Sequence, residues 1–207
     1  MASFGAGLLG VSAAFAQQDI VTFSSINPND TFNNGGSYTL GYEFDVTTPI
    51  TVTGLSVFNA TPGTGLNVNT PVGLWNASQT EIASATVLAG IADPLTSDGF
   101  FRYATLSTPV TLPDGTYYVG AVSTARSGKY TDDVNGLAAI SGITFVGSAE
   151  NNGTGLLAFP ELEGPGTNGI FGGNVVVGAT PVPEPEFSKL LWMGLAGLGA
   201  FGLKKLL

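Results

Sequence analysis

The sequences YTLGYEFDV at residues 38–46 and ITVTGLSVF at residues 50–58 decide the fold of this chain. In both stretches, apolar and polar side chains alternate. This is the two-residue period of a β-strand, whose successive side chains point to opposite faces of a sheet. The two stretches therefore predict strands that bury one face in a core and turn the other toward water.

Short stretches of the same kind continue along the rest of the chain. The further predicted strands are residues 71–75, 81–88, 100–106, 116–123, 143–146, 156–159 and 174–178. Turn signals separate them roughly every 8–12 residues. Because no interior segment has the helical period, we expect an all-β fold, an antiparallel β-sandwich or jelly roll, as a single domain over residues 17–180. Residues 147–173, rich in glycine and asparagine, are predicted as long loops with one or two short strands.

The composition excludes several classes of function. Of the 207 residues, 43% are hydrophobic, which is enough for a core, and only 10% are charged, against about 25% in an ordinary soluble domain. The chain has no cysteine and no histidine, which excludes disulfides, Cys/His zinc sites and histidine-based catalytic triads. The net charge is -9, so we expect no nucleic-acid partner.

The N-terminus is typical of an export signal. Residues 4–15 are apolar or small and uncharged, and they lead into Ala14-Phe15-Ala16. Ala14 and Ala16 supply the small residues that a signal peptidase requires before its cleavage point. We expect residues 1–16 to be a signal peptide, truncated because its basic start is missing, with cleavage after Ala16. The alternative is a buried first strand or helix.

The C-terminus has the pattern of a short membrane segment. The prolines of residues 181–185 predict an extended linker that a processing enzyme can reach. Fourteen uncharged residues, 190–203, follow and are closed by Lys204 and Lys205. As a helix they would span about 21 Å, against about 30 Å for a bilayer core. We expect a short C-terminal transmembrane helix with Lys204 and Lys205 on the cytoplasmic side; the alternative is a buried helix of a soluble domain.

These C-terminal features resemble the PEP-CTERM sorting signal. The resemblance covers residues 181–207, with Pro183, Glu184 and Pro185 as its signature, Trp192 early in a Gly/Leu-rich helix, and a basic end. In that family an exosortase, an integral membrane enzyme, cleaves the tail after export, and the hosts are bacteria that make extracellular polysaccharide. The resemblance implies transient anchoring in the inner membrane with the body outside, and then delivery to the cell surface or the extracellular medium.

A second resemblance covers residues 38–124. Its motifs, in chain order, are residues 40–44, 50–55, 73–76, 83–86, 109–110 and 115–119. This series is similar to the DUF4082-type β-sandwich of extracellular bacterial proteins. The resemblance implies a fold and no activity, because the matching positions are core and turn residues and the family has no established catalytic residues.

Two acidic patterns are candidates for chemistry. Glycoside hydrolysis needs two carboxylates about 5–10 Å apart across a cleft. Glu43 and Asp45 lie on one predicted strand, and their side chains point to the same face of the sheet. We interpret them as an outward, solvated face and expect no catalytic residues. Asp132-Asp133 could bind Ca²⁺ or a sugar, or form a plain acidic loop; beyond this Ca²⁺ option, we expect no metal site and no cofactor.

Exposed aromatic side chains are candidates for stacking on sugar rings. The sequence offers Trp75, Phe100, Phe101, Tyr103, Tyr117, Tyr118 and Tyr130. Neighbours in a strand point to opposite faces, so one member of each adjacent pair must lie outside the core or at a sheet edge. Phe101, Tyr118 and Tyr130 are our candidate glycan contacts, and coverage of a sheet edge is the alternative explanation.

The function expected from these observations is non-enzymatic. We expect an exported cell-surface or extracellular-matrix protein that associates with exopolysaccharide and has an exosortase as a transient partner. The first alternative is a carbohydrate-active enzyme that uses a carboxylate pair. The second is a Ca²⁺-dependent adhesin module.

The sorting signal makes a direct prediction. Replacement of Pro183, Glu184 and Pro185 by alanine should leave uncleaved precursor in the membrane fraction, because the exosortase loses its recognition motif. Fractionation and immunoblotting measure this, and deletion of residues 187–207 should release the body to the periplasm. A triple-alanine variant that is processed and delivered like the wild type would show that the tail is only a weak membrane anchor.

Overall fold

In the computed structural model, the described residues are 17–27, 31–32, 36–126, 130–132, 134–153, 155–164 and 169–178, and every element among them is a β-strand. The predicted signal peptide (residues 1–16, with Ala14 and Ala16) and the predicted sorting signal (residues 181–207, with the membrane helix 190–203, Lys204 and Lys205) lie outside the described residues. Within the described ranges, no helix has the length and apolar character needed to cross a membrane.

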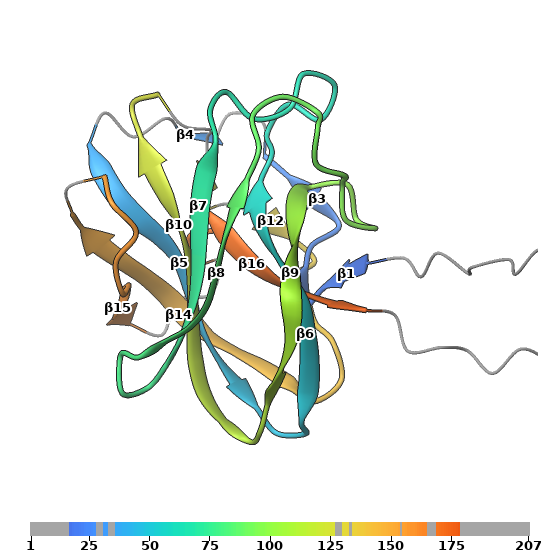
Figure 1. Ribbon diagram of the computed structural model, residues 1–207, viewed down its shortest axis with the longest axis vertical. Coiled ribbons are helices and arrows are strands. Elements are labelled where there is room, and N and C mark those ends of the chain that lie inside the picture. Colours follow the sequence, from blue (N-terminus) through green and yellow to red (C-terminus); the bar gives the residue numbers. More distant parts are fainter. Residues whose placement is uncertain are drawn as a thin grey trace, which may run out of the picture. The chain divides into compact units, whose positions relative to one another are not determined.

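Two antiparallel sheets form the body of the protein (Figure 1). The six-stranded sheet has the order β15 (Glu161–Gly164), β14 (Ile143–Asn152), β5 (Ser37–Val46), β10 (Gly115–Thr124), β7 (Thr70–Asn76), β8 (Glu81–Val87). The four-stranded sheet has the order β1 (Gln17–Asp19), β16 (Gly173–Gly178), β6 (Ile50–Phe58), β9 (Phe101–Leu112). The expected all-β, antiparallel, sandwich-like fold is therefore confirmed.

Three two-residue ladders join the N-terminal segment to residues 130–139. They are β2 (Val21–Thr22) with β13 (Ala138–Ala139), β3 (Ser25–Ile26) with β12 (Val134–Asn135), and β4 (Thr31–Phe32) with β11 (Tyr130–Thr131). Strands of two residues contain no full period of alternation, so the sequence pattern does not reveal them.

The core fills the space between the two sheets. Tyr42 and Phe44 of β5 belong to the same buried cluster as Val52 and Leu55 of β6. Phe171, just before β16, packs against the ring of Tyr42 with centroids 5.9 Å apart. The alternation at residues 38–46 and 50–58 thus marks the side chains that meet between the sheets.

Most predicted strands match observed ones to within one or two residues at each end, but two extend by about six residues beyond the prediction. Strand β9 continues to Leu112 and β14 to Asn152, so part of the region predicted as loops is strand. Residues 105–111 of β9 are mostly exposed, so no apolar alternation marks them. Strand β14 continues because it stays paired with β5 as far as the pair Asn152 and Tyr38.

Residues 155–160, which we call the strap, cover the outer face of the six-stranded sheet without forming a strand. The backbone N–H of Ala158 donates to Thr39 Oγ1 at 3.1 Å, and that hydroxyl donates to the Leu156 carbonyl at 3.5 Å. The prediction of a strand at residues 156–159 is therefore wrong. The strap is held by a side chain of β5 rather than by a neighbouring strand.

A row of glycines makes room for the strap. Gly41 of β5 is paired with Gly120 of β10, and Gly120 is paired with Gly73 of β7. A Cβ atom on Gly120 would lie 3.2 Å from Pro160 Cγ, and one on Gly73 would lie 3.1 Å from Leu157 Cδ2. A larger residue at Gly120 or Gly73 would therefore crowd the strap as well as the neighbouring side chains of the sheet.

The same row gives a stability prediction. A Cβ atom on Gly41 would lie 1.8 Å from the Val119 carbonyl oxygen, a backbone atom that cannot move without distorting the sheet. Gly41→Ala should therefore lower the free energy of unfolding by about 1–3 kcal/mol. Urea denaturation of residues 17–180 measures this change.

The matched control is Gly63→Ala, because a Cβ atom there has nothing within 4 Å. This variant should be as stable as the wild type or up to about 1 kcal/mol more stable, through reduced entropy of the unfolded chain. Equal denaturation midpoints for the Gly41 and Gly63 variants would contradict the close approach of β5 and β10.

Candidate functional site

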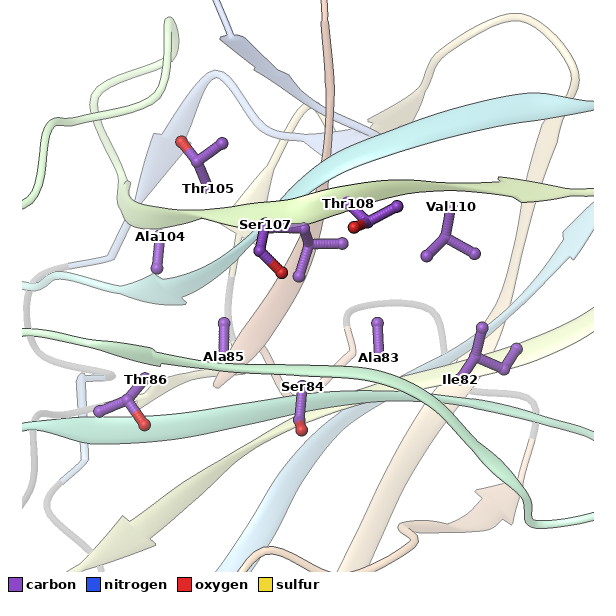
Figure 2. Close-up of a pocket in the computed structure, with 11 residues that line it drawn as sticks. Ile82, Ala83, Ser84, Ala85, Thr86, Ala104, Thr105, Ser107, Thr108 and Val110 are labelled. Carbon is purple, nitrogen blue, oxygen red and sulfur yellow. The ribbon is translucent and has the colours of Figure 1, made fainter.

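A groove with a volume of about 520 Å³ lies between β8 and β9 (Figure 2). Each of these strands is the last strand of its sheet, so the groove lies along one open side of the sandwich. Its lining residues are Ile82, Ala83, Ser84, Ala85, Thr86, Ala104, Thr105, Leu106, Ser107, Thr108 and Val110.

The groove owes its shape to a bulge in β9. Thr105 is paired with Gly54 of β6, and Val110 is paired with Val52, so residues 106–109 of β9 have only Thr53 opposite them. Surplus residues on one strand break the ladder and bend that strand. Pro109 lies within this stretch, and a proline has no N–H to donate to a neighbouring strand.

Small side chains keep the groove open. Figure 2 shows Ala83 and Ala85 pointing from β8 toward β9, and Ala104 and Val110 pointing from β9 toward β8. Ser107 also points into the space, so a hydroxyl is available beside these apolar groups. Among the residues that the structure describes, no ionisable side chain lines the groove. The lining can therefore offer van der Waals contact and neutral hydrogen bonds to a ligand.

The candidate glycan contact Phe101 is not exposed, which corrects the sequence interpretation. Its side chain is 0% exposed and packs against Phe58 and Phe23, with ring centroids 5.8 and 5.7 Å away. The first residue of β9 faces the core here, and Phe100 is the outer member of the pair. Even Phe100 is half-buried, with its ring 4.7 Å from that of Phe23.

Tyr118 lies on the outer face of the six-stranded sheet, under the strap. Its ring contacts Phe159 of the strap at 4.7 Å between centroids. Burial, a hydrogen bond to Glu43 and the charges of Glu43 and Asp45 raise the pKa of Tyr118 to about 12. Trp75 on the same face is only 3% exposed and also contacts Phe159. The aromatic face of the sheet is therefore covered by the chain itself.

The carboxylates on that face differ from expectation. Glu43 is only 9% exposed, because Tyr118 lies beside it, so the prediction of a solvated face is wrong for this residue. Asp45 is half-buried and accepts a hydrogen bond from Thr116 at 2.6 Å. The two side chains are engaged with different partners and do not form a cleft.

Tyr130 and the acidic loop lie apart from the other candidates. Tyr130 of β11 is half-buried, and burial, followed by the charges of Asp132 and Glu150, raises its pKa. Asp132 is exposed, and Asp133 lies outside the described residues. Among the residues that the structure describes, no group of three or more acidic side chains is gathered to hold a metal ion.

A buried polar cluster around Asp19 was not predicted. Ser56 donates to Asp19 Oδ1 at 2.6 Å, while Thr96 and the backbone N–H of Phe100 donate to Asp98 Oδ1 at 2.9 and 3.0 Å. The other oxygens, Asp19 Oδ2 and Asp98 Oδ2, are buried and have no hydrogen-bond partner among the described residues.

The cluster is assembled only in the folded chain. The N–H of Ser97 donates to the Gln17 carbonyl at 3.1 Å and brings the loop before β9 against β1. Burial, and then the charge of Asp98, raises the pKa of Asp19 well above its ordinary value, against the opposing effect of hydrogen bonds from Ser56 and Thr96. Burial also raises the pKa of Asp98. No local motif in the sequence indicates this long-range pairing.

The raised pKa of Asp19 has a consequence for stability. An unfolded aspartate titrates near about 3.9, so between that value and the raised folded pKa the folded state holds a proton that the unfolded chain has released. The carboxyl of Asp19 therefore makes its full contribution to the free energy of unfolding below about pH 4. This contribution is lost as the pH rises through the pKa of the folded state. In metal-free buffer, the wild type should lose stability relative to Asp19→Asn as the pH rises from about 5 to 8.

Chemical denaturation at several pH values measures this difference. The control is Asp114→Asn in the exposed turn before β10, and this variant should follow the wild type throughout. A difference between the wild type and Asp19→Asn that stays constant with pH would contradict the raised pKa.

Comparison with known proteins agrees with the second sequence resemblance. Residues 25–166 match the family model described as a domain of unknown function (DUF4082). No curated protein matches the chain. The match covers more than half of the sequence, every strand of the six-stranded sheet, and β6 and β9 of the four-stranded sheet. The chain therefore belongs to the DUF4082 family.

Proposed function

We propose that the protein is an exported, non-catalytic component of the cell surface or extracellular matrix that binds exopolysaccharide in the groove between β8 and β9. The observation that carries this proposal is the lining of the groove. Its described residues join apolar side chains, several of them alanines, with hydroxyl groups, and none of them is ionisable. A sugar chain offers complementary chemistry, since its rings have apolar faces and its rims carry hydroxyl groups.

The form of the groove suits a polymer. Residues 82–86 of β8, which line the other side of the groove, extend for about 13 Å at roughly 3.3 Å per residue, which is longer than one sugar ring. The groove is open and runs between two strands that each have a neighbour on one side only. A chain-like ligand could lie along it and hydrogen bond to edge backbone groups as well as to Ser107.

The same lining supports binding without turnover. Glycoside hydrolysis needs a carboxyl acid and a second carboxylate on either side of the scissile bond, and the groove contributes neither. Glu43 is covered by Tyr118, and the carboxyl of Asp19 is buried. Glu81 accepts a hydrogen bond from Ser84 of the groove at 2.7 Å, but a single carboxylate does not make up the pair that hydrolysis needs.

The domain boundaries support export and sorting. Strand β1 begins at Gln17, the first residue after the expected cleavage point, and β16 ends at Gly178, just before the expected linker. Gln17 and Gly178 are paired with each other. Removal of residues 1–16 and cleavage near Pro183-Glu184-Pro185 by an exosortase would therefore leave the paired strands of the domain complete.

Retention on the host's own exopolysaccharide tests the proposal. Ala85→Leu should fill the groove and reduce the affinity of residues 17–180 at least about tenfold, a loss of about 1.4 kcal/mol. The matched control is Ala139→Leu, which adds the same side chain at an exposed position of β13 and should bind like the wild type. Equal retention of both variants would refute the groove as the binding site.

The two alternative functions predict different results in the same assay. Release of new reducing ends from the polysaccharide would indicate a carbohydrate-active enzyme. Binding that is abolished by a chelator, yet unaffected by Ala85→Leu, would indicate a Ca²⁺-dependent adhesin module that uses another surface.

A further inference from the structure

Asp19 and Asp98 present an unusual electrostatic problem. Asp19 is 1% exposed, and the groups that act on its carboxyl are Ser56, Thr96 and the like-charged Asp98. No lysine or arginine is among them. A buried carboxylate without a cationic partner is costly, and two neighbouring ones are costlier still.

The two arginines in the described ranges do not relieve this charge. Arg102 donates to the carbonyl oxygens of Asp93 and Pro62 at 2.5 and 2.7 Å, which occupies its guanidinium with neutral acceptors. Arg126 is exposed in the turn after β10. Within the described ranges, no cationic side chain therefore neutralises the carboxyl pair.

The oxygens available at the pair are those that a hard cation prefers. Asp19 Oδ2 and Asp98 Oδ2 are buried and make no hydrogen bond to the described residues. The hydroxyl of Thr96 donates to Asp98 and also acts on Asp19, so it lies close to both carboxyls. Carboxylate and neutral oxygen ligands together are characteristic of Ca²⁺ sites, whereas zinc sites use sulfur and nitrogen.

We propose that Asp19 and Asp98 bind one divalent cation, Ca²⁺ in the extracellular setting, through Asp19 Oδ2 and Asp98 Oδ2. Thr96 and water would complete the oxygen shell. This site is separate from Asp132-Asp133 and from the groove, so it does not depend on the glycan proposal. Bound Ca²⁺ would fix strand β1 to the loop that precedes β9, because each element supplies one ligand.

Thermal unfolding of the full chain in neutral detergent tests the site. Extracellular Ca²⁺ modules bind with Kd of about 10⁻⁴–10⁻³ M. About 10 mM Ca²⁺ should therefore raise the Tm by about 3–10 °C over the value in EDTA. Asp19→Asn and Asp98→Asn should each remove most of this shift. Each variant is compared with itself, so a lower starting Tm does not hide the result.

The matched control is Asp132→Asn, which changes the exposed acidic loop and should keep the full shift. Three results would overturn the proposal. The wild type could show no shift with Ca²⁺, which would mean that the pair is neutralised by a proton alone. Asp132→Asn could abolish the shift, which would move the site to that loop. Both Asp19→Asn and Asp98→Asn could keep the shift, which would remove these side chains from the site.

Discussion

Strand β5 has to bury both of its faces, and this constraint shapes the rest of the domain. It lies inside the six-stranded sheet, paired with β10 on one side and β14 on the other. Tyr42 and Phe44 fill the space between the sheets, whereas Thr39, Gly41 and Glu43 point to the other face and are also buried. The strap is the element that covers the second face. Gly120 and Gly73 let it approach the backbone.

Because both faces of β5 are buried, a ligand has to reach the domain at another place, and a sheet edge is one such place. The aromatic side chains that would suit a sugar, Trp75 and Tyr118, are occupied by Phe159 of the strap. The edge formed by β8 and β9 stays open, because residues 106–109 bulge and alanines face one another across the gap. The carboxyls of Asp19 and Asp98, each with a buried oxygen that lacks a hydrogen-bond partner among the described residues, lie at a different place, between β1 and the loop before β9. The proposed ligand groove and the Asp19 and Asp98 pair thus lie at separate places in the domain.

The positions of the strands could be predicted from the sequence, because apolar and polar side chains alternate where a strand buries one of its faces. The stretches 38–46 and 50–58 are strands with nearly the predicted ends. The strap was misassigned as a strand because an apolar run such as residues 156–159 has the same composition whether it pairs with a strand or packs on one. The prediction that Phe101 is exposed was wrong for a different reason. Two adjacent aromatic residues in a strand indicate that one of them points outward, but they do not indicate which of the two it is. The Asp19 and Asp98 pair could not be predicted, since its residues meet only through the register of β1 with β16 and the course of the loop before β9.

The central claim is that the open edge between β8 and β9 is the ligand-binding surface of the domain. Amide chemical-shift mapping of ¹⁵N-labelled protein, titrated with soluble fragments of the host exopolysaccharide, tests it most directly. The account predicts that shifts concentrate in residues 82–86 and 104–110 and that the strap amides stay unchanged. Shifts confined to the strap and Tyr118, or to the region of Tyr130, would contradict it.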